Sequence, residues 1–139
     1  MRPPLPALLI LFCLNVSAQE LVLISQDSSH TFLGCLTCSK YDSGSICNKY
    51  GDQGSKYGSN SIWNKYGDFG SKYSDKSPWN TYASTPPAIV DREGNFYGYF
   101  TSNKFLNDRT TIQLYAALTD AIDWVNDDLD RARDAVCEN

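Results

Sequence analysis

The chain has 139 residues and a formal net charge of −4 at pH 7, with 42% hydrophobic and 13% aromatic residues. This length suits a single domain with a modest hydrophobic core. The negative balance argues against a protein that holds DNA or RNA by general electrostatic attraction, because such proteins neutralise phosphates with an excess of Lys and Arg.

Residues 1–18 have the pattern of a secretory signal peptide. Arg2 gives a positively charged start, and residues 5–14 form an apolar run of about ten residues, whereas a membrane helix needs about 20. Small residues precede a cleavage site that we place after Ala18. We therefore expect one exported domain over residues 19–139, periplasmic or secreted, with no membrane span after cleavage.

Two β-hairpins are predicted, one before and one after the middle of the chain. Apolar residues 21–25 and 31–34 flank a polar segment, while residues 88–90 and 95–101 flank a Gly-containing turn. The first hairpin contains Phe-Leu-Gly where the second contains Phe-Tyr-Gly. We expect the two hairpins to share a small antiparallel sheet.

Four cysteines remain after removal of the signal peptide, and an even number in an exported chain favours two disulfides. They are Cys35, Cys38, Cys47 and Cys137. Three pairings are possible, and the sequence alone does not choose among them. A bridge to Cys137 would close a loop of about a hundred residues and stabilise the fold by about 4–5 kcal/mol in the chain-entropy model.

A sixteen-residue motif occurs twice, at 45–60 and 61–76, with identical residues at eleven of the sixteen paired positions. Partial copies on both sides extend the repeat region to residues 39–82. A fixed period of this kind indicates one small structural unit stacked on itself. So few copies need capping elements, which the two hairpins can supply. Residues 83–139 are expected to contain the second hairpin and a C-terminal helix.

Within one copy the residues predict short turns. Ser61 can cap a helical turn, Gly67 can end it in a left-handed conformation, and Gly70 begins a second turn. Tyrosines recur with gaps of 7 and 9 residues, which fits neither a long helix nor an alternating strand. We expect a coil-rich aromatic repeat with one-turn helices, held by aromatic packing and by Asn side chains bonded to the backbone.

The C-terminal segment is predicted to be one amphipathic helix that begins near Thr110 or Thr111. Its apolar residues follow one another at three- and four-residue steps and share one face, while the opposite face is acidic. The apolar stripe comprises Leu114, Leu118, Ala121, Ile122, Val125, Leu129, Ala132 and Val136. The expected fold class is α+β: a small antiparallel sheet of two hairpins, the repeat, and a C-terminal amphipathic helix.

Residues 32–101 carry a specific combination of motifs. The repeat reads Ser-Ile-x-Asn-x-Tyr-Gly-x-(aromatic)-Gly-Ser-x-Tyr-Ser, followed by Ser-Pro-Trp-Asn and by Asp-x-x-Gly-Asn-Phe-Tyr-Gly-Tyr-Phe. In this pattern the chain resembles a group of small exported bacterial proteins of unassigned function. Gln53 and Cys47 depart from the pattern, because the second copy has Phe69 and Trp63 at the equivalent positions.

The recurring chemistry of the repeat is aromatic and amide side chains. A groove that binds a glycan or a peptide stacks it on ring faces and orients it with amides, but the same residues also serve to hold a repeat together. The candidate ligand-binding residues are Tyr50, Tyr57, Tyr66, Tyr73, Trp63, Trp79, Asn48, Asn64 and Asn80. We expect a monomeric, non-catalytic binding or structural module whose partner is a protein or an envelope polysaccharide, with no nucleic acid, cofactor or metal.

An envelope enzyme is the alternative interpretation. Cys35 and Cys38 have the spacing of a redox pair or of half a zinc site, although the second half of a zinc site is missing. Thiol-redox or hydrolase chemistry would use these cysteines with His30, the one histidine of the sequence. A structural disulfide is the simpler interpretation of the pair.

Overall fold

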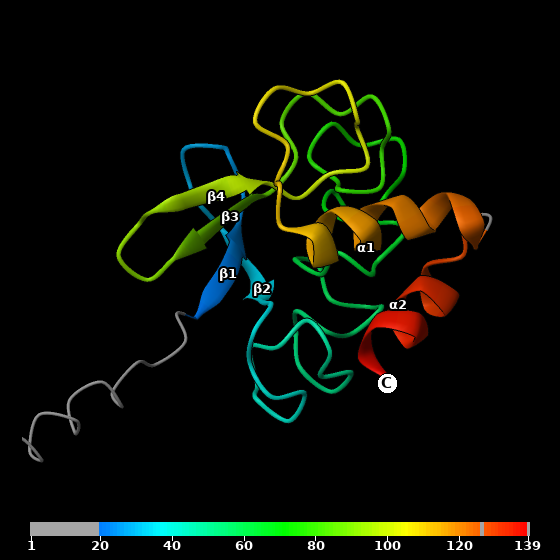
Figure 1. Cartoon of the computed structure of the whole chain (residues 1–139). Coiled ribbons are helices and arrows are strands. Elements are labelled where there is room, and N and C mark those ends of the chain that lie inside the picture. The colour runs from blue at the N-terminus through cyan, green and yellow to red at the C-terminus, as the bar shows by residue number, and fades with distance from the viewer. Residues whose placement is uncertain (1–19, 126, 139) are drawn as a thin grey trace, which may run out of the picture.

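The computed structural model describes residues 20–125 and 127–138, whose arrangement is drawn in Figure 1. The signal peptide predicted at residues 1–18 lies outside the described residues. In the two described ranges, no helix combines the length and the apolar character needed to cross a membrane.

Four short strands form one antiparallel sheet of two hairpins, which confirms the predicted sheet. The strands are β1 (Leu21–Ile24), β2 (Phe32–Cys35), β3 (Ala88–Asp91) and β4 (Phe96–Tyr99). Their order is β2-β1-β3-β4, so β1 and β3 join the hairpins, with Val22 opposite Val90. Because the repeat leaves the sheet after β2 and returns at β3, the sheet holds both of its ends.

Between β2 and β3 the chain is a string of reverse turns, seen in Figure 1 as loops beside the sheet. From Ser39 to Ala83, backbone N–H groups at about every third position donate to the carbonyl oxygen three residues earlier. Five such turns make up one copy of the motif, so residues sixteen positions apart occupy equivalent places. The expected one-turn helices are therefore single reverse turns.

Inward-facing residues of successive copies stack into an aromatic column. The ring centroids of Trp63 and Trp79 lie 5.4 Å apart in a stacked arrangement. Phe100 follows at 5.9 Å from Trp79, and Tyr115 follows at 6.3 Å from Phe100, both edge to face. All four rings are buried and belong to one hydrophobic cluster with Ile46 and Ile62 of the repeat and with residues of the sheet and helices, so the turn-rich segment shares its core with the rest of the fold.

The first copy has no indole for the aromatic column, because Cys47 stands where the second copy has Trp63. Cys47 forms a disulfide with Cys137. The buried guanidinium of Arg133 donates to the carbonyl oxygens of Cys47, at 2.8 Å, and Gly54, at 3.2 Å. The departure from the motif at position 47 therefore attaches the C-terminal segment to the repeat.

The C-terminal segment forms two helices, α1 (Gln113–Trp124) and α2 (Leu129–Cys137), where one helix was predicted. Asp127 has a φ of 63°, a left-handed conformation that an α-helix does not accommodate. The side chain of Asp128 then accepts the N–H groups of the next turn and caps α2.

This break divides the predicted apolar stripe. Leu118, Ile122 and Leu129 are buried, whereas Leu114 remains 64% exposed. Both helices lie beside the coil of turns, and α2 is bonded to it by the Cys47–Cys137 disulfide.

All four predicted cysteines form disulfides, paired Cys35–Cys38 and Cys47–Cys137. The structure thereby decides the pairing that the sequence left open. Two disulfides in a small domain indicate an oxidising, extracytoplasmic compartment.

Candidate functional site

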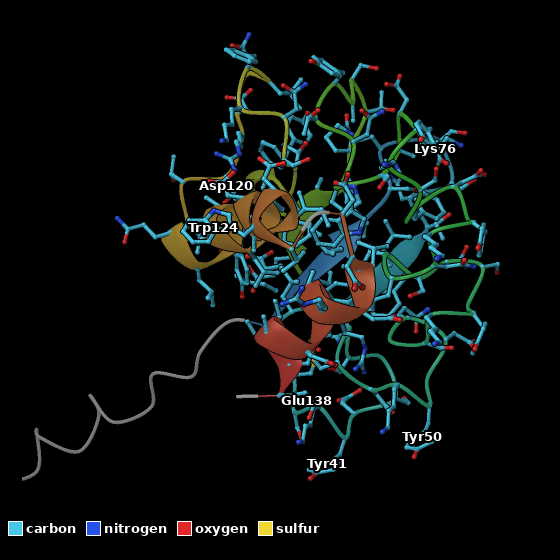
Figure 2. The ribbon with its side chains drawn as sticks, turned by 90° about the vertical axis from the view of Figure 1, so that its right-hand side faces the viewer. Tyr41, Tyr50, Lys76, Asp120, Trp124 and Glu138 are labelled. Atoms are coloured by element: carbon cyan, nitrogen blue, oxygen red, sulfur yellow. A yellow bond between two sulfur atoms is a disulfide. The ribbon has the colours of Figure 1, made fainter. Side chains whose placement is uncertain are left out.

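Six tyrosines of the repeat region lie at the tips of turns. Figure 2 shows Tyr41 and Tyr50 at the edge of the coil, with their rings directed away from the ribbon. The six side chains are 81–89% exposed, although the indoles of the same copies are buried. The six are Tyr41, Tyr50, Tyr57, Tyr66, Tyr73 and Tyr82. The two kinds of ring therefore have separate roles: the indoles pack, and the phenols remain in water.

Local hydrogen bonds hold the turns that carry the exposed tyrosines. The Oδ1 atom of Asn64 accepts the N–H of Tyr66 at 3.0 Å, and the Nδ2 atom of Asn64 donates to the carbonyl oxygen of Gly58 at 3.0 Å. Other tips have a serine instead of an asparagine two residues before the tyrosine. There the Ser55 hydroxyl oxygen accepts the N–H of Tyr57. These bonds fix the backbone of each turn, and the phenol at its tip stays exposed.

This arrangement changes the list of candidate ligand-binding residues. Trp63 and Trp79 are 2% exposed, and their indole N–H groups donate to the carbonyl oxygens of Ile46 and Ile62. The two indoles lie beneath the outer surface of the repeat and offer almost no area to a ligand. The amides of Asn48, Asn64 and Asn80 are likewise bonded to backbone atoms through both Oδ1 and Nδ2. The tyrosines are the candidates that remain accessible.

The structure also adds an aromatic residue that the sequence interpretation missed. Phe105, in the loop between β4 and α1, is 90% exposed. The Oδ1 atom of Asn103 accepts its N–H at 3.0 Å, and Nδ2 of Asn103 donates to the carbonyl oxygen of Ala83 at 2.9 Å. This turn continues the coil after β4. Its signal in the sequence is the tripeptide Asn-Lys-Phe, which parallels Asn-Lys-Tyr in the repeat.

A lysine immediately precedes five of the six exposed tyrosines. In each pair the Nζ atom lies 5.3–5.6 Å from the centroid of the following ring, where the ring quadrupole attracts a cation. The lysines are Lys40, Lys49, Lys56, Lys65 and Lys72. The outer surface of the coil is therefore a series of paired cationic and aromatic groups.

Four of these lysine–tyrosine pairs form one wall of a groove. Three cavities of about 420, 490 and 520 Å³ lie between this wall and the residues around α2. The first and second cavities share Tyr57 and Asp130, and the second and third share Tyr66 and Asp127. We call this series of three adjoining cavities the repeat groove.

The opposite wall of the repeat groove is acidic. The Nζ atom of Lys56 lies 3.8 Å from Asp130 Oδ2, and that of Lys72 lies 3.3 Å from Asp127 Oδ2. The hydrogen bond to Asp127 raises the pKa of Lys72. All four side chains are about half exposed, so these ion pairs contribute little to stability and can exchange for contacts with a ligand.

The alternative site at Cys35, Cys38 and His30 is not brought together. His30 lies in the exposed loop that precedes β2, whereas Cys35 ends that strand. The strand alone, from Phe32 to Cys35, extends over about 10 Å at the usual rise.

Glu20 lies against the Cys35–Cys38 disulfide. Its Oε1 atom is 3.3 Å from Cys35 Sγ and 3.0 Å from Cys38 Sγ, and Arg92 pairs with the same carboxylate. That hydrogen bond from Arg92 lowers the pKa of Glu20. Glu20, Cys35 and Cys38 lie close enough together to suggest a metal site. The two sulfurs are bonded to each other, however, and provide no thiolate ligands.

No protein-family model matches the chain, and no curated protein or solved structure is found to be similar to it. The functional interpretation therefore depends on the geometry of the repeat groove and the exposed tyrosines.

Proposed function

We propose that this protein is a non-catalytic binding module that acts outside the cytoplasm, in the periplasm or after secretion, and presents its tyrosine-lined surface to an envelope partner. The observation that supports it most strongly is the contrast between buried and exposed rings in the second copy of the motif. The indole of Trp63 is 2% exposed, while the phenol of Tyr66, three residues later, is 87% exposed. Folding stability gains little from an exposed ring, because the apolar area of that ring stays in water.

The regular recurrence of these rings adds to the argument. Exposed apolar residues scattered singly over a surface need no explanation, but an ordered series over one edge of the molecule is typical of an interaction surface. Tyr is also well suited to such surfaces, because its ring offers a large rigid contact area and its hydroxyl offers a hydrogen bond.

The redox alternative has weaker support. A catalytic cysteine needs a stabilised thiolate, which a neighbouring positive charge or helix N-terminus provides. Here the carboxylate of Glu20 lies beside both sulfurs, and a negative charge at that place opposes a thiolate. The surroundings of Cys35 and Cys38 favour a disulfide that stabilises the end of β2.

Co-sedimentation with insoluble envelope material from the producing cells tests the proposal. The mature protein, residues 19–139, is compared with the double variant Tyr50→Ala/Tyr66→Ala. We expect the wild type to sediment with the material and the double variant to remain largely in the supernatant. Both side chains are more than four-fifths exposed, so the variant should keep its circular dichroism spectrum and thermal midpoint.

Trp124→Ala is the matched control. Trp124 is 89% exposed, like the tyrosines, but it lies at the end of α1 and lines none of the three cavities. This variant should sediment like the wild type. Equal loss in Trp124→Ala and in the tyrosine variant, or no loss in either, would refute the proposed role of the tyrosines.

A further inference from the structure

The repeat groove has an internal period. Each of its three cavities is bounded by two successive lysine–tyrosine pairs, and each shares one pair with the next cavity. The central cavity, for example, lies between the pair that contains Tyr57 and the pair that contains Tyr66. The first and third cavities are equivalent, because their tyrosines lie sixteen positions apart, and the central cavity joins them. A surface built from repeated, adjoining subsites matches a linear ligand made of repeated, adjoining units.

The spacing of the coil fits such a ligand. The stacked rings of Trp63 and Trp79, which occupy equivalent places in successive copies, have centroids 5.4 Å apart, and we take this distance as the advance of one copy. This advance is similar to the length of one pyranose unit in an extended polysaccharide. Tyr50 and Tyr66, which occupy equivalent places in successive copies, can therefore meet consecutive sugar rings.

The charges that line the repeat groove nearly cancel. The described lining residues include five basic side chains, Lys49, Lys56, Lys65, Lys72 and Arg133, and four acidic ones, Asp127, Asp128, Asp130 and Asp134. Their net charge is therefore +1. A site for a polyanion would be expected to carry a clear excess of Lys and Arg, and a site for a polycation would carry the opposite excess.

A balanced set of charged groups instead suits a neutral ligand that is rich in hydroxyl groups. Lysine ammonium groups donate hydrogen bonds, and aspartate carboxylates accept them, so both partners of a sugar hydroxyl are present along the groove. The tyrosine rings supply flat apolar area against which the C–H face of a pyranose ring can pack. Lys49 and Lys65 form no ion pair with any described residue, so their ammonium groups are available for this purpose.

We propose that the repeat groove binds a neutral, linear polysaccharide, with consecutive sugar units lying along its three cavities. This inference deepens the proposed binding function and depends on it. Single-stranded nucleic acid also stacks on aromatic residues, but it requires a positive groove along its backbone, and the acidic wall at α2 opposes that.

Isothermal titration calorimetry on the mature protein tests the ligand class. The probes are neutral hexasaccharides (cellohexaose, maltohexaose and chitohexaose), the acidic hexagalacturonate and an oligothymidylate. We expect at least one neutral hexasaccharide to bind, with affinity that rises from disaccharide to trisaccharide and changes little between low and high salt. Tyr57→Ala and Tyr66→Ala, each at the boundary of two cavities, should weaken that binding by about tenfold, and Trp124→Ala should leave it unchanged.

Two results would overturn this inference and leave the proposed function intact. One is stronger binding of hexagalacturonate or the oligothymidylate with a steep loss in high salt. The other is no binding of any neutral probe by a protein that still sediments with envelope material through its tyrosines. If the tyrosine variants change neither calorimetric binding nor sedimentation, both proposals fail.

Discussion

The indole N–H of Trp63 donates to the carbonyl oxygen of Ile46 at 2.6 Å, which joins one copy of the motif to the copy before it. Trp79 makes the same bond to Ile62, so the contact recurs with the period of the sequence. Each indole thus packs in the aromatic column and also satisfies a buried backbone acceptor of the preceding turn. This pairing explains how a segment without helices or strands keeps a defined core.

Replacing Trp63 with Phe should therefore destabilise the protein. The variant keeps an aromatic ring but leaves the carbonyl oxygen of Ile46 without its donor, at a cost of about 1–3 kcal/mol. Urea denaturation measures the free energy of unfolding. Trp124→Phe, on an 89% exposed side chain, should change it by less than about 0.5 kcal/mol. Equal effects of the two substitutions would contradict the role assigned to the Trp63 bond.

The two disulfides should differ in their contribution to stability. Cys47 and Cys137 are 90 residues apart in the sequence, whereas Cys35 and Cys38 are 3 apart. In the chain-entropy model, the double variant Cys47→Ala/Cys137→Ala loses about 4–5 kcal/mol, and Cys35→Ala/Cys38→Ala loses about 1–2 kcal/mol. Thermal unfolding of the two variants checks the order, and the reverse order would show that the short bridge has a role beyond chain entropy.

Asp91, at the turn between β3 and β4, should make the free energy of unfolding depend on pH. Asp91 is 2% exposed, and it accepts hydrogen bonds from Asn95, Tyr97 and the N–H of Glu93. These bonds, with that from the Asn95 side chain foremost, lower the pKa of Asp91 to about 2. Because the folded pKa lies below the ordinary value of about 3.9, the ionised form stabilises the fold above that pH.

This stabilisation should be lost as the pH falls from about 4 through the folded pKa of about 2. Urea unfolding over this range should show a decline for the wild type and a flatter, lower profile for Asp91→Asn. Asp123→Asn, which changes an exposed carboxylate on α1, should keep the wild-type decline. A decline in Asp91→Asn as steep as in the wild type would assign the acid sensitivity to other groups.

Two glycines of the second copy should respond differently to substitution. A Cβ atom at Gly70 would overlap the carbonyl oxygen of Asn64, a backbone atom that cannot move without opening the turn. A Cβ atom at Gly67 would have as its nearest neighbour the Asn64 amide nitrogen, at 3.3 Å. Gly70→Ala should therefore lower the free energy of unfolding by about 1–3 kcal/mol, and Gly67→Ala by clearly less. Similar thermal midpoints for the two variants would refute this ranking.

Several features of the fold were predictable because they depend on residues close in the sequence. Alternating apolar runs around turn residues located both hairpins, and the period of sixteen located the stacked copies. The division of the C-terminal segment was not predicted, because its apolar stripe continues across Val125 and Leu129 as it would in one helix. The left-handed Asp127 and the capping side chain of Asp128 end this continuity.

The candidate site was predictable only in part. The sequence identified tyrosine, tryptophan and asparagine as recurring residues, but a period alone does not say which of them face inward. Turn geometry decides this, because the first turn of the second copy directs Trp63 into the column and the next turn directs Tyr66 to solvent.

By itself, the sequence determined the cysteines available for disulfides, the two hairpins and the repeat, since each of these depends on local composition or on a fixed spacing. Only the tertiary structure decided that Cys47 pairs with Cys137, that Phe105 extends the aromatic series, and that α2 forms a wall opposite Tyr57 and Tyr66. These features join segments far apart in the chain. Their formation depends on how the copies stack and bury their rings, which no local pattern encodes.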